Sequence, residues 1–185
     1  MSGFTTLIDT TYERAKQGDW TYVLTQWGAI PALARRCSRF QKISSGWSFL
    51  HQAAYMGHEE ACWLLVRGGA CVALKNHQGE TASDIAQRKG HAALAVWLTR
   101  AQLDPNGLWA APSDPDELPS SNRWDEAQQR HAREDRLVAY AGSIVHIPSG
   151  ARYFVDDFER TLIGWHGTFD PPMDMGGYAL FETPT

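Results

Sequence analysis

The stretch GWSFLHQAAYMGH, residues 46–58, is followed 33 positions later by a second copy, GETASDIAQRKGH, at residues 79–91. Both copies begin with glycine and end with the same Gly-His pair. The offset also relates further residues of the two copies: Gly46 and Gly79, Ala53 and Ala86, Gly57 and Gly90, His58 and His91, Leu65 and Leu98. A fixed period of this length predicts stacked units, each built from a turn and two short helices.

The first of these copies has the residues that such a unit needs. Ala53 and Ala54 are small enough to let neighbouring helices approach closely, and Leu65 belongs to the apolar inner face of the second helix. Gly57 is placed where a left-handed residue ends the first helix. The pattern therefore predicts a packed helix pair over residues 47–67.

Both copies resemble the ankyrin repeat, whose family pattern is G-x-T-P-L-H-x-A-A-x-x-G-H, followed by an apolar helix and G-A-D-V-N. The later copy departs further from this pattern, with Asp84 at the position of His51. Residues 10–27 are read as a divergent first unit, with about six extra residues near 30–42. The resemblance implies about three repeats over residues 10–100, in which His51 and His58 form structural hydrogen bonds.

After Arg100 the composition changes. Residues 110–121 are rich in Pro, Ser and Asp, which predicts a linker or strap. Asn122 is placed to cap a helix from about Arg123 to Arg136. From residue 137 the apolar period becomes two, which predicts an antiparallel meander with strands over 138–147, 153–155 and 161–165. The expected class is thus α+β, divided into an ankyrin domain (1–101), a linker or strap (102–121) and a helix-plus-meander region (122–185).

Charge is unevenly distributed along the chain. Residues 1–100 carry eleven Lys and Arg against seven Asp and Glu, whereas residues 101–185 carry six against fourteen. Opposite balances favour contact between the two halves, so we expect the C-terminal region to pack on the repeats, with apolar contacts from Leu108, Trp109 or Trp124. Neither half has the dense basic stripe that is typical of nucleic-acid binding.

Several classes of protein are not indicated by this sequence. No apolar run reaches the length of a membrane span, and the N-terminus lacks a secretory pattern. The three cysteines, Cys37, Cys62 and Cys71, lack zinc-ligand spacing and are interpreted as free thiols in a reducing cytoplasm. The sequence shows no phosphate-binding loop or nucleophile elbow, and we expect neither a metal nor a cofactor.

Two functions remain open. The first is a protein-binding module (an adaptor, a regulator or an immunity-type inhibitor) whose partner has an acidic patch. The resemblance places its contacts on the inner helices and the hairpin tip, at Glu13, Lys16, Gln17, Gln52, Tyr55, Met56, Lys75, Asn76, His77, Gln78, Ile85, Arg88 and Lys89. The second is a small enzyme, or a second surface, in the meander around Asp156, Asp157, Trp165 and His166. Together with Glu159 and His146, these side chains offer acid and base groups or cation ligands, although acids in a hairpin turn are more often solvated.

Overall fold

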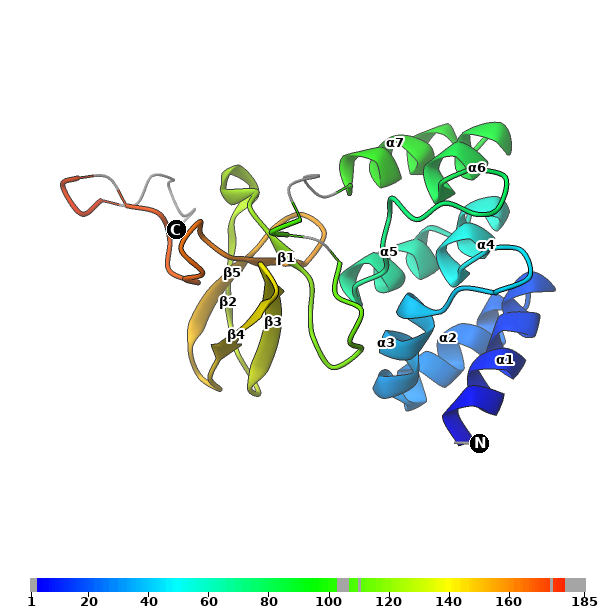
Figure 1. Cartoon of the computed structure of the whole chain (residues 1–185), viewed down its shortest axis with the longest axis horizontal. Coiled ribbons are helices and arrows are strands. Elements are labelled where there is room, and N and C mark those ends of the chain that lie inside the picture. The colour runs from blue at the N-terminus through cyan, green and yellow to red at the C-terminus, as the bar shows by residue number, and fades with distance from the viewer. Residues whose placement is uncertain (1–2, 103–106, 110, 174, 179–185) are drawn as a thin grey trace. The chain divides into compact units, whose positions relative to one another are not determined.

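The computed structural model describes residues 3–102, 107–109, 111–173 and 175–178, and divides into two compact units, residues 1–102 and 103–185. Within these described ranges, seven α-helices precede a region of short strands (Figure 1). The α+β class expected from the sequence is confirmed. No described helix has the length and apolar character that a bilayer crossing requires.

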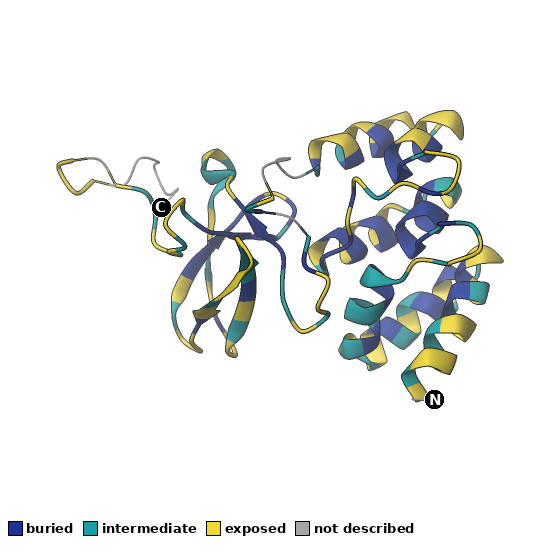
Figure 2. Ribbon diagram, in the orientation of Figure 1, coloured by how far each residue is buried: buried dark blue, intermediate teal, exposed yellow. Residues whose placement is uncertain are grey.

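Three helix pairs form the first unit: α1 (Gly3–Lys16) with α2 (Trp20–Ala29), α4 (Phe49–Met56) with α5 (Glu59–Arg67), and α6 (Ala82–Arg88) with α7 (Ala92–Arg100). The first helices pack in sequence, α1 on α4 and α4 on α6. The extra residues near 30–42 form a further helix, α3 (Pro31–Arg39), which begins at a proline, the residue best suited to a first helical position. Figure 2 shows buried residues along the facing sides of these helices.

Residues 33 positions apart have the same turn and helix-cap geometry in the structure. Gly46 and Gly79, at the equivalent hairpin turns, have similar φ angles of 71° and 78°. Ser48 caps α4 together with His51, and Thr81 caps α6 together with Asp84; in both helices the N-cap and N3 side chains satisfy each other's backbone N–H groups. Asp84 therefore performs the capping role of His51, and the later copy keeps the repeat geometry despite its different residues.

The second unit is built from short strands. A sheet with the order β1-β6-β5-β2 contains Ser120–Ser121, Thr161–Leu162, Arg152–Val155 and Gln128–His131, and a separate hairpin pairs β3 (Arg136–Tyr140) with β4 (Ser143–Ile147). Neighbouring strands are antiparallel except β1 and β6, which are parallel. The core of this unit includes Val138, Ile147, Tyr153, Val155 and Ile163.

Two local predictions for this unit are wrong. The helix expected over 123–136 is a single 3-10 turn, Trp124–Glu126, followed by strand β2, because residues 128–131 pair with β5. The single strand expected over 138–147 is a hairpin instead, because Ala141 and Gly142 both adopt positive φ, 49° and 76°, and reverse the chain. The predicted third strand, 161–165, is shorter and ends at Leu162.

The stretch expected to be a strap supplies part of this second unit. Trp109 is buried, and its indole N–H donates to the carbonyl of Ile163 at 3.2 Å. Its ring also lies 6.0 Å from that of Tyr140. Ser120 and Ser121 form β1, and Trp124 packs 5.9 Å from the ring of Phe154. These tryptophans therefore contribute to the core of the unit that contains them. The docking of this unit on the repeats stays a prediction.

Candidate functional site

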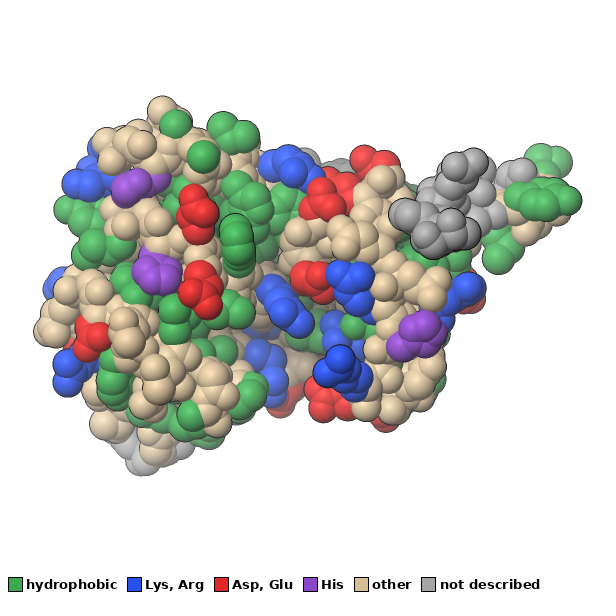
Figure 3. Space-filling model, turned by 180° about the vertical axis from the view of Figure 1, so that it is seen from behind, with side chains coloured by type: hydrophobic (Ala, Val, Ile, Leu, Met, Phe, Trp, Pro, Cys, Tyr) green, Lys and Arg blue, Asp and Glu red, His purple; other side chains and the backbone are tan. Residues whose placement is uncertain are grey.

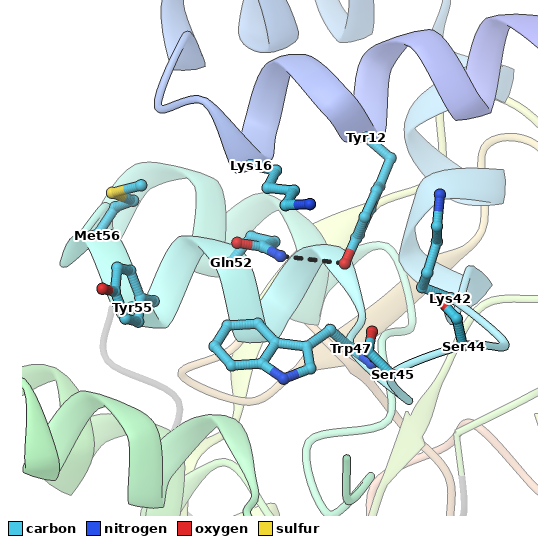
Figure 4. Close-up of a pocket in the computed structure, with 9 residues that line it drawn as sticks. All are labelled: Tyr12, Lys16, Lys42, Ser44, Ser45, Trp47, Gln52, Tyr55 and Met56. Atoms are coloured by element: carbon cyan, nitrogen blue, oxygen red, sulfur yellow. Dashed lines mark hydrogen bonds between the residues drawn. The ribbon is translucent and has the colours of Figure 1, made fainter. Parts of the chain in front are cut away.

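A cleft of about 360 Å³ lies between α1, α4 and the loop that precedes α4 (Figure 4). Helices and loop contribute aromatic, cationic and hydroxyl-bearing side chains, and the whole cleft is formed within the helical unit. Its lining consists of Tyr12, Lys16, Lys42, Ser44, Ser45, Trp47, Gln52, Tyr55 and Met56. We call this set the repeat cleft.

The hairpin before α4 positions one wall of the repeat cleft. The Lys42 N–H donates to the Trp47 carbonyl at 2.8 Å, and the Gly46 N–H donates back to the Lys42 carbonyl at 2.7 Å. This tight turn places Trp47 immediately before the N-cap of α4. The indole then meets the ring of Tyr55 edge-on, with centroids 5.9 Å apart. Trp47 and Tyr55 are both only partly buried, so they keep apolar surface for another molecule.

The base of the cleft is formed by Tyr12 and Gln52, from neighbouring repeats. The Gln52 amide donates to the Tyr12 hydroxyl oxygen at 3.0 Å, as Figure 4 shows. Tyr12 is 2% exposed, and its ring packs on Phe40 and Phe49 with centroid distances of 5.0 and 5.3 Å. Burial raises the pKa of the Tyr12 hydroxyl, which therefore keeps its proton.

Three lysines surround these aromatic rings. Lys42 pairs with Glu13 at 3.1 Å and lies 5.5 Å from the centre of the Tyr12 ring, and Lys89 lies 4.4 Å from the centre of the Tyr55 ring. Lys16 is exposed and, among the described residues, has no carboxylate partner. On the face drawn in Figure 3, acidic and basic side chains are interspersed on each unit. The charged side chains that line the cleft are Lys16 and Lys42, so a charge preference at the cleft comes from lysines.

The structure brings part of the predicted binding set together. Gln52, Tyr55 and Met56 line the cleft, and Lys89 stacks on Tyr55. Arg88 is exposed but forms an ion pair with Glu80 at 2.9 Å. Lys75, His77 and Gln78 are exposed around the turn between the second and third units, where Asn76 is buried and its side-chain oxygen accepts from Gln78 and Glu80.

Ile85 is not part of this surface, because its side chain is 0% exposed. It occupies the position of Gln52, one period later. That position faces the preceding repeat: Gln52 reaches Tyr12 on α1, and α6 packs on α4 in the same way. The equivalent residue of the third unit therefore fills the interface between repeats and is unavailable to a partner.

Sequence reasoning missed Trp47, Tyr12 and the loop residues Lys42, Ser44 and Ser45. A signal existed for Trp47, because an unpatterned position of the hairpin held a large aromatic residue where the repeat requires none. Tyr12 and Lys42 carried no such signal. Their place in the cleft depends on how α1 and the inserted helix α3 set the chain before the second unit.

The alternative site in the meander is not assembled as an acid and base centre. Asp156 is fully buried, and its carboxylate accepts from the Phe158 and Arg160 N–H groups and pairs with the Arg160 guanidinium at 3.0 Å. Asp157 is exposed and accepts from Gln128 at 3.1 Å. Asp156 thus closes the turn between β5 and β6, which is a structural role.

The remaining members of that group lie at the surface. Trp165 is 67% exposed, and His166 is exposed beside it. His146 pairs with Asp135 at 3.1 Å instead of facing the acids of the turn. Within the described ranges, no three His, Cys, Asp or Glu side chains are grouped to hold a metal ion.

Comparisons with known proteins identify an ankyrin repeat in the helical unit. The family model "Ankyrin repeat" matches residues 45–77. The chain is 33% identical over 104 residues to "Calmodulin-binding transcription activator CBT" of Oryza sativa subsp. japonica, a match that covers 51% of this chain and 11% of that protein. It is 32% identical over 84 residues to "Calmodulin-binding transcription activator 4" of Arabidopsis thaliana, covering 42% and 8%. The chain thus spans about a tenth of the length of these relatives, and the helical unit carries ankyrin repeats.

Proposed function

We propose that this chain is an interaction protein that binds another protein through the repeat cleft and the exposed turn at residues 75–78. Ankyrin repeats indicate a protein-protein interaction module. The observation that carries the proposal is the half-buried pair Trp47 and Tyr55, whose rings form a wall of a preformed cleft. Roles as an adaptor or as an inhibitor of a partner enzyme both fit this mode of action.

The residue types of the repeat cleft support binding to a protein. Tyr, Trp and Met are enriched at the centres of interfaces, where they bury large apolar areas at a low cost in side-chain entropy. Tyr55 is held on two sides, by Trp47 and by the Lys89 ammonium group. Such a prearranged ring loses little further freedom when a partner packs on it. Met56, 40% exposed at the end of α4, adds an adaptable apolar contact.

A site-specific photocrosslinker tests the proposal. Tyr55 is replaced by p-benzoylphenylalanine in the full chain, and the same amino acid replaces Trp63 in a control, since Trp63 is 52% exposed on α5 outside the cleft. After irradiation in the cells that produce the chain, we expect a crosslinked protein at position 55 that is absent at position 63. Excess wild-type chain should abolish the crosslink.

The variant Tyr55→Ala supplies the quantitative test with the purified partner. Removing a central interface tyrosine should weaken binding by about 2 kcal/mol or more, while Trp63→Ala leaves the affinity within about 0.5 kcal/mol. A partner whose affinity is unchanged by Tyr55→Ala but lost on substitution of Asp157 and Trp165 would assign binding to the second unit, against this proposal.

A further inference from the structure

The repeat cleft combines an apolar half and a polar half. Trp47, Tyr55 and Met56 provide the apolar surface; in Figure 4, Tyr55 and Met56 lie at the left and the Trp47 ring lies below the centre. Lys16, Lys42, Ser44 and Ser45 come from α1 and the loop before α4. Ile43, in the same loop, is 93% exposed.

The polar half of the cleft is rich in hydrogen-bond donors. Ser45, beside the buried Tyr12 hydroxyl that accepts from Gln52, brings one hydroxyl group to the lining. Ser44 adds a hydroxyl group, and Lys16 adds an ammonium group without a carboxylate partner among the described residues. The carboxylate of Glu13 is paired with Lys42, and that of Asp9 also acts on Lys42. Hydroxyl and ammonium donors together favour an anionic acceptor.

We propose that the occupant of the repeat cleft is a segment of a partner protein in which a carboxylate side chain adjoins a large apolar one. The carboxylate meets Lys16 and the hydroxyl groups, while the apolar side chain packs against Trp47, Tyr55 and Met56. This inference rests on the proposed function and specifies the chemistry of its partner. It also assigns Lys16 the largest electrostatic contribution, because Lys42 is already paired with a carboxylate and Lys89 is not among the residues that line the cleft.

Selection of short random peptides displayed on phage tests the inference without assuming a sequence. The full chain is the bait, and the double variant Tyr55→Ala/Lys16→Glu is the counter-selection bait. Peptides kept by the wild type and lost by the variant report on the cleft alone. We expect these peptides to share an Asp or Glu next to a Phe, Trp, Leu or Ile.

Binding of one selected peptide is then measured by fluorescence anisotropy. Lys16→Glu should weaken it about tenfold and remove most of its salt dependence, whereas Arg67→Glu, the same charge reversal at an exposed position on α5, should change it less than about twofold. Replacing the acidic residue of the peptide by its amide should reproduce the loss seen with Lys16→Glu.

The outcomes separate this inference from the proposed function. Cleft-dependent peptides that are basic or uncharged would overturn the acidic partner but keep the cleft as a protein-binding site. Peptides retained equally by the double variant would overturn both. Finally, if the photocrosslinker at position 55 reacts within the purified chain alone and the crosslink maps to residues 103–185, the occupant is the chain's own acidic C-terminal half and not a partner.

Discussion

Gln52 donates a hydrogen bond to Tyr12 across 40 positions of sequence, at 3.0 Å, and so joins α4 of the second repeat to α1 of the first. Gln52 is buried in this role, with 7% of the residue exposed. A residue expected to touch a partner thus orders the base of the cleft in the free chain. Its contribution to binding is to hold Tyr12 in place, and the exposed contacts come from Tyr55, Met56 and Lys16.

Two glycines at equivalent positions should respond differently to the same substitution. Gly57 and Gly90 both have positive φ, 67° and 86°, so an alanine at either is strained by about 1 kcal/mol. A Cβ at position 57 would also lie 2.6 Å from the His91 ring, whereas at position 90 it meets nothing within 4 Å. We therefore expect Gly57→Ala to cost about 1–2 kcal/mol more than Gly90→Ala.

Urea unfolding followed by far-ultraviolet circular dichroism measures this difference, because the described α-helices all belong to the repeat unit. The His91 ring cannot move away without loss, since its Nε2 is bonded to the Tyr55 carbonyl at 3.3 Å. Equal urea midpoints for Gly57→Ala and Gly90→Ala would show that the His91 ring moves aside without a cost in stability.

His51 should make the repeats sensitive to mild acid. Its Nδ1 accepts from the Ser48 N–H at 3.1 Å and its Nε2 donates to the Glu80 carbonyl at 3.1 Å, an arrangement that only the neutral ring allows. Burial lowers the pKa of His51 below its ordinary value of 6.5. Below pH 6.5 the unfolded chain therefore binds a proton that the folded chain does not, and stability falls as the pH drops toward the folded pKa.

The measurement compares wild type with His51→Gln by urea unfolding between about pH 7.5 and about pH 5.5, a range above the titration of the carboxylates. The wild type should lose more stability over this range than the variant. Parallel losses in the two proteins would mean that the His51 ring does not carry the pH dependence.

The buried pair of Asp156 and Arg160 should be essential to the second unit. Asp156→Asn leaves the guanidinium group in the core without its carboxylate, which costs about 3–5 kcal/mol. Hydrogen exchange of residues 128–163 should lose protection in this variant. Asp157→Asn, one position away and exposed, is the matched control and should keep the wild-type pattern. Full protection in Asp156→Asn would contradict the structural role of the pair.

The three cysteines should differ sharply in reactivity. Cys37 and Cys62 are both 0% exposed, and burial raises the pKa of the Cys37 thiol to about 12 and that of Cys62 as well. Cys71 is exposed. Ellman's reagent should therefore titrate one thiol in the native chain and all three after denaturation. Cys71→Ser should remove the reaction in the native chain. A rapidly reacting thiol in that variant would be inconsistent with the burial of Cys37 and Cys62.

The repeats were predictable because their signals are local. Gly46 and Gly79 mark equivalent turns, and the cap residues Ser48 and Thr81 stand within one turn of the helices they begin. The cleft was predictable in part, since Tyr55 and Met56 follow from the repeat pattern. Ile85 could not be separated from them by its position alone, because the same position can face a neighbouring repeat or a partner, depending on how α6 packs on α4.

The second unit was harder to predict because its strands depend on distant partners. Residues 123–136 have an apolar spacing compatible with a helix, yet Gln128–His131 pairs with β5, more than twenty positions away. The turn at Ala141 and Gly142 has a weak sequence signal, since alanine rarely takes the φ of 49° that this reversal requires. The family pattern covers neither segment.

The parallel pairing of β1 with β6 affects the order in which the two units can fold during synthesis. Ser120 pairs with Thr161, 41 positions later, whereas every residue of the helical unit has been synthesised once residue 102 is added. Domains generally fold as units during synthesis, the N-terminal one first. The helical unit is therefore expected to be complete during synthesis, while the strand at Ser120–Ser121 lacks its paired strand β6 until residue 162 has emerged. During that interval the nascent chain already presents a finished cleft while the sheet is still incomplete, so partner capture does not have to await the end of translation.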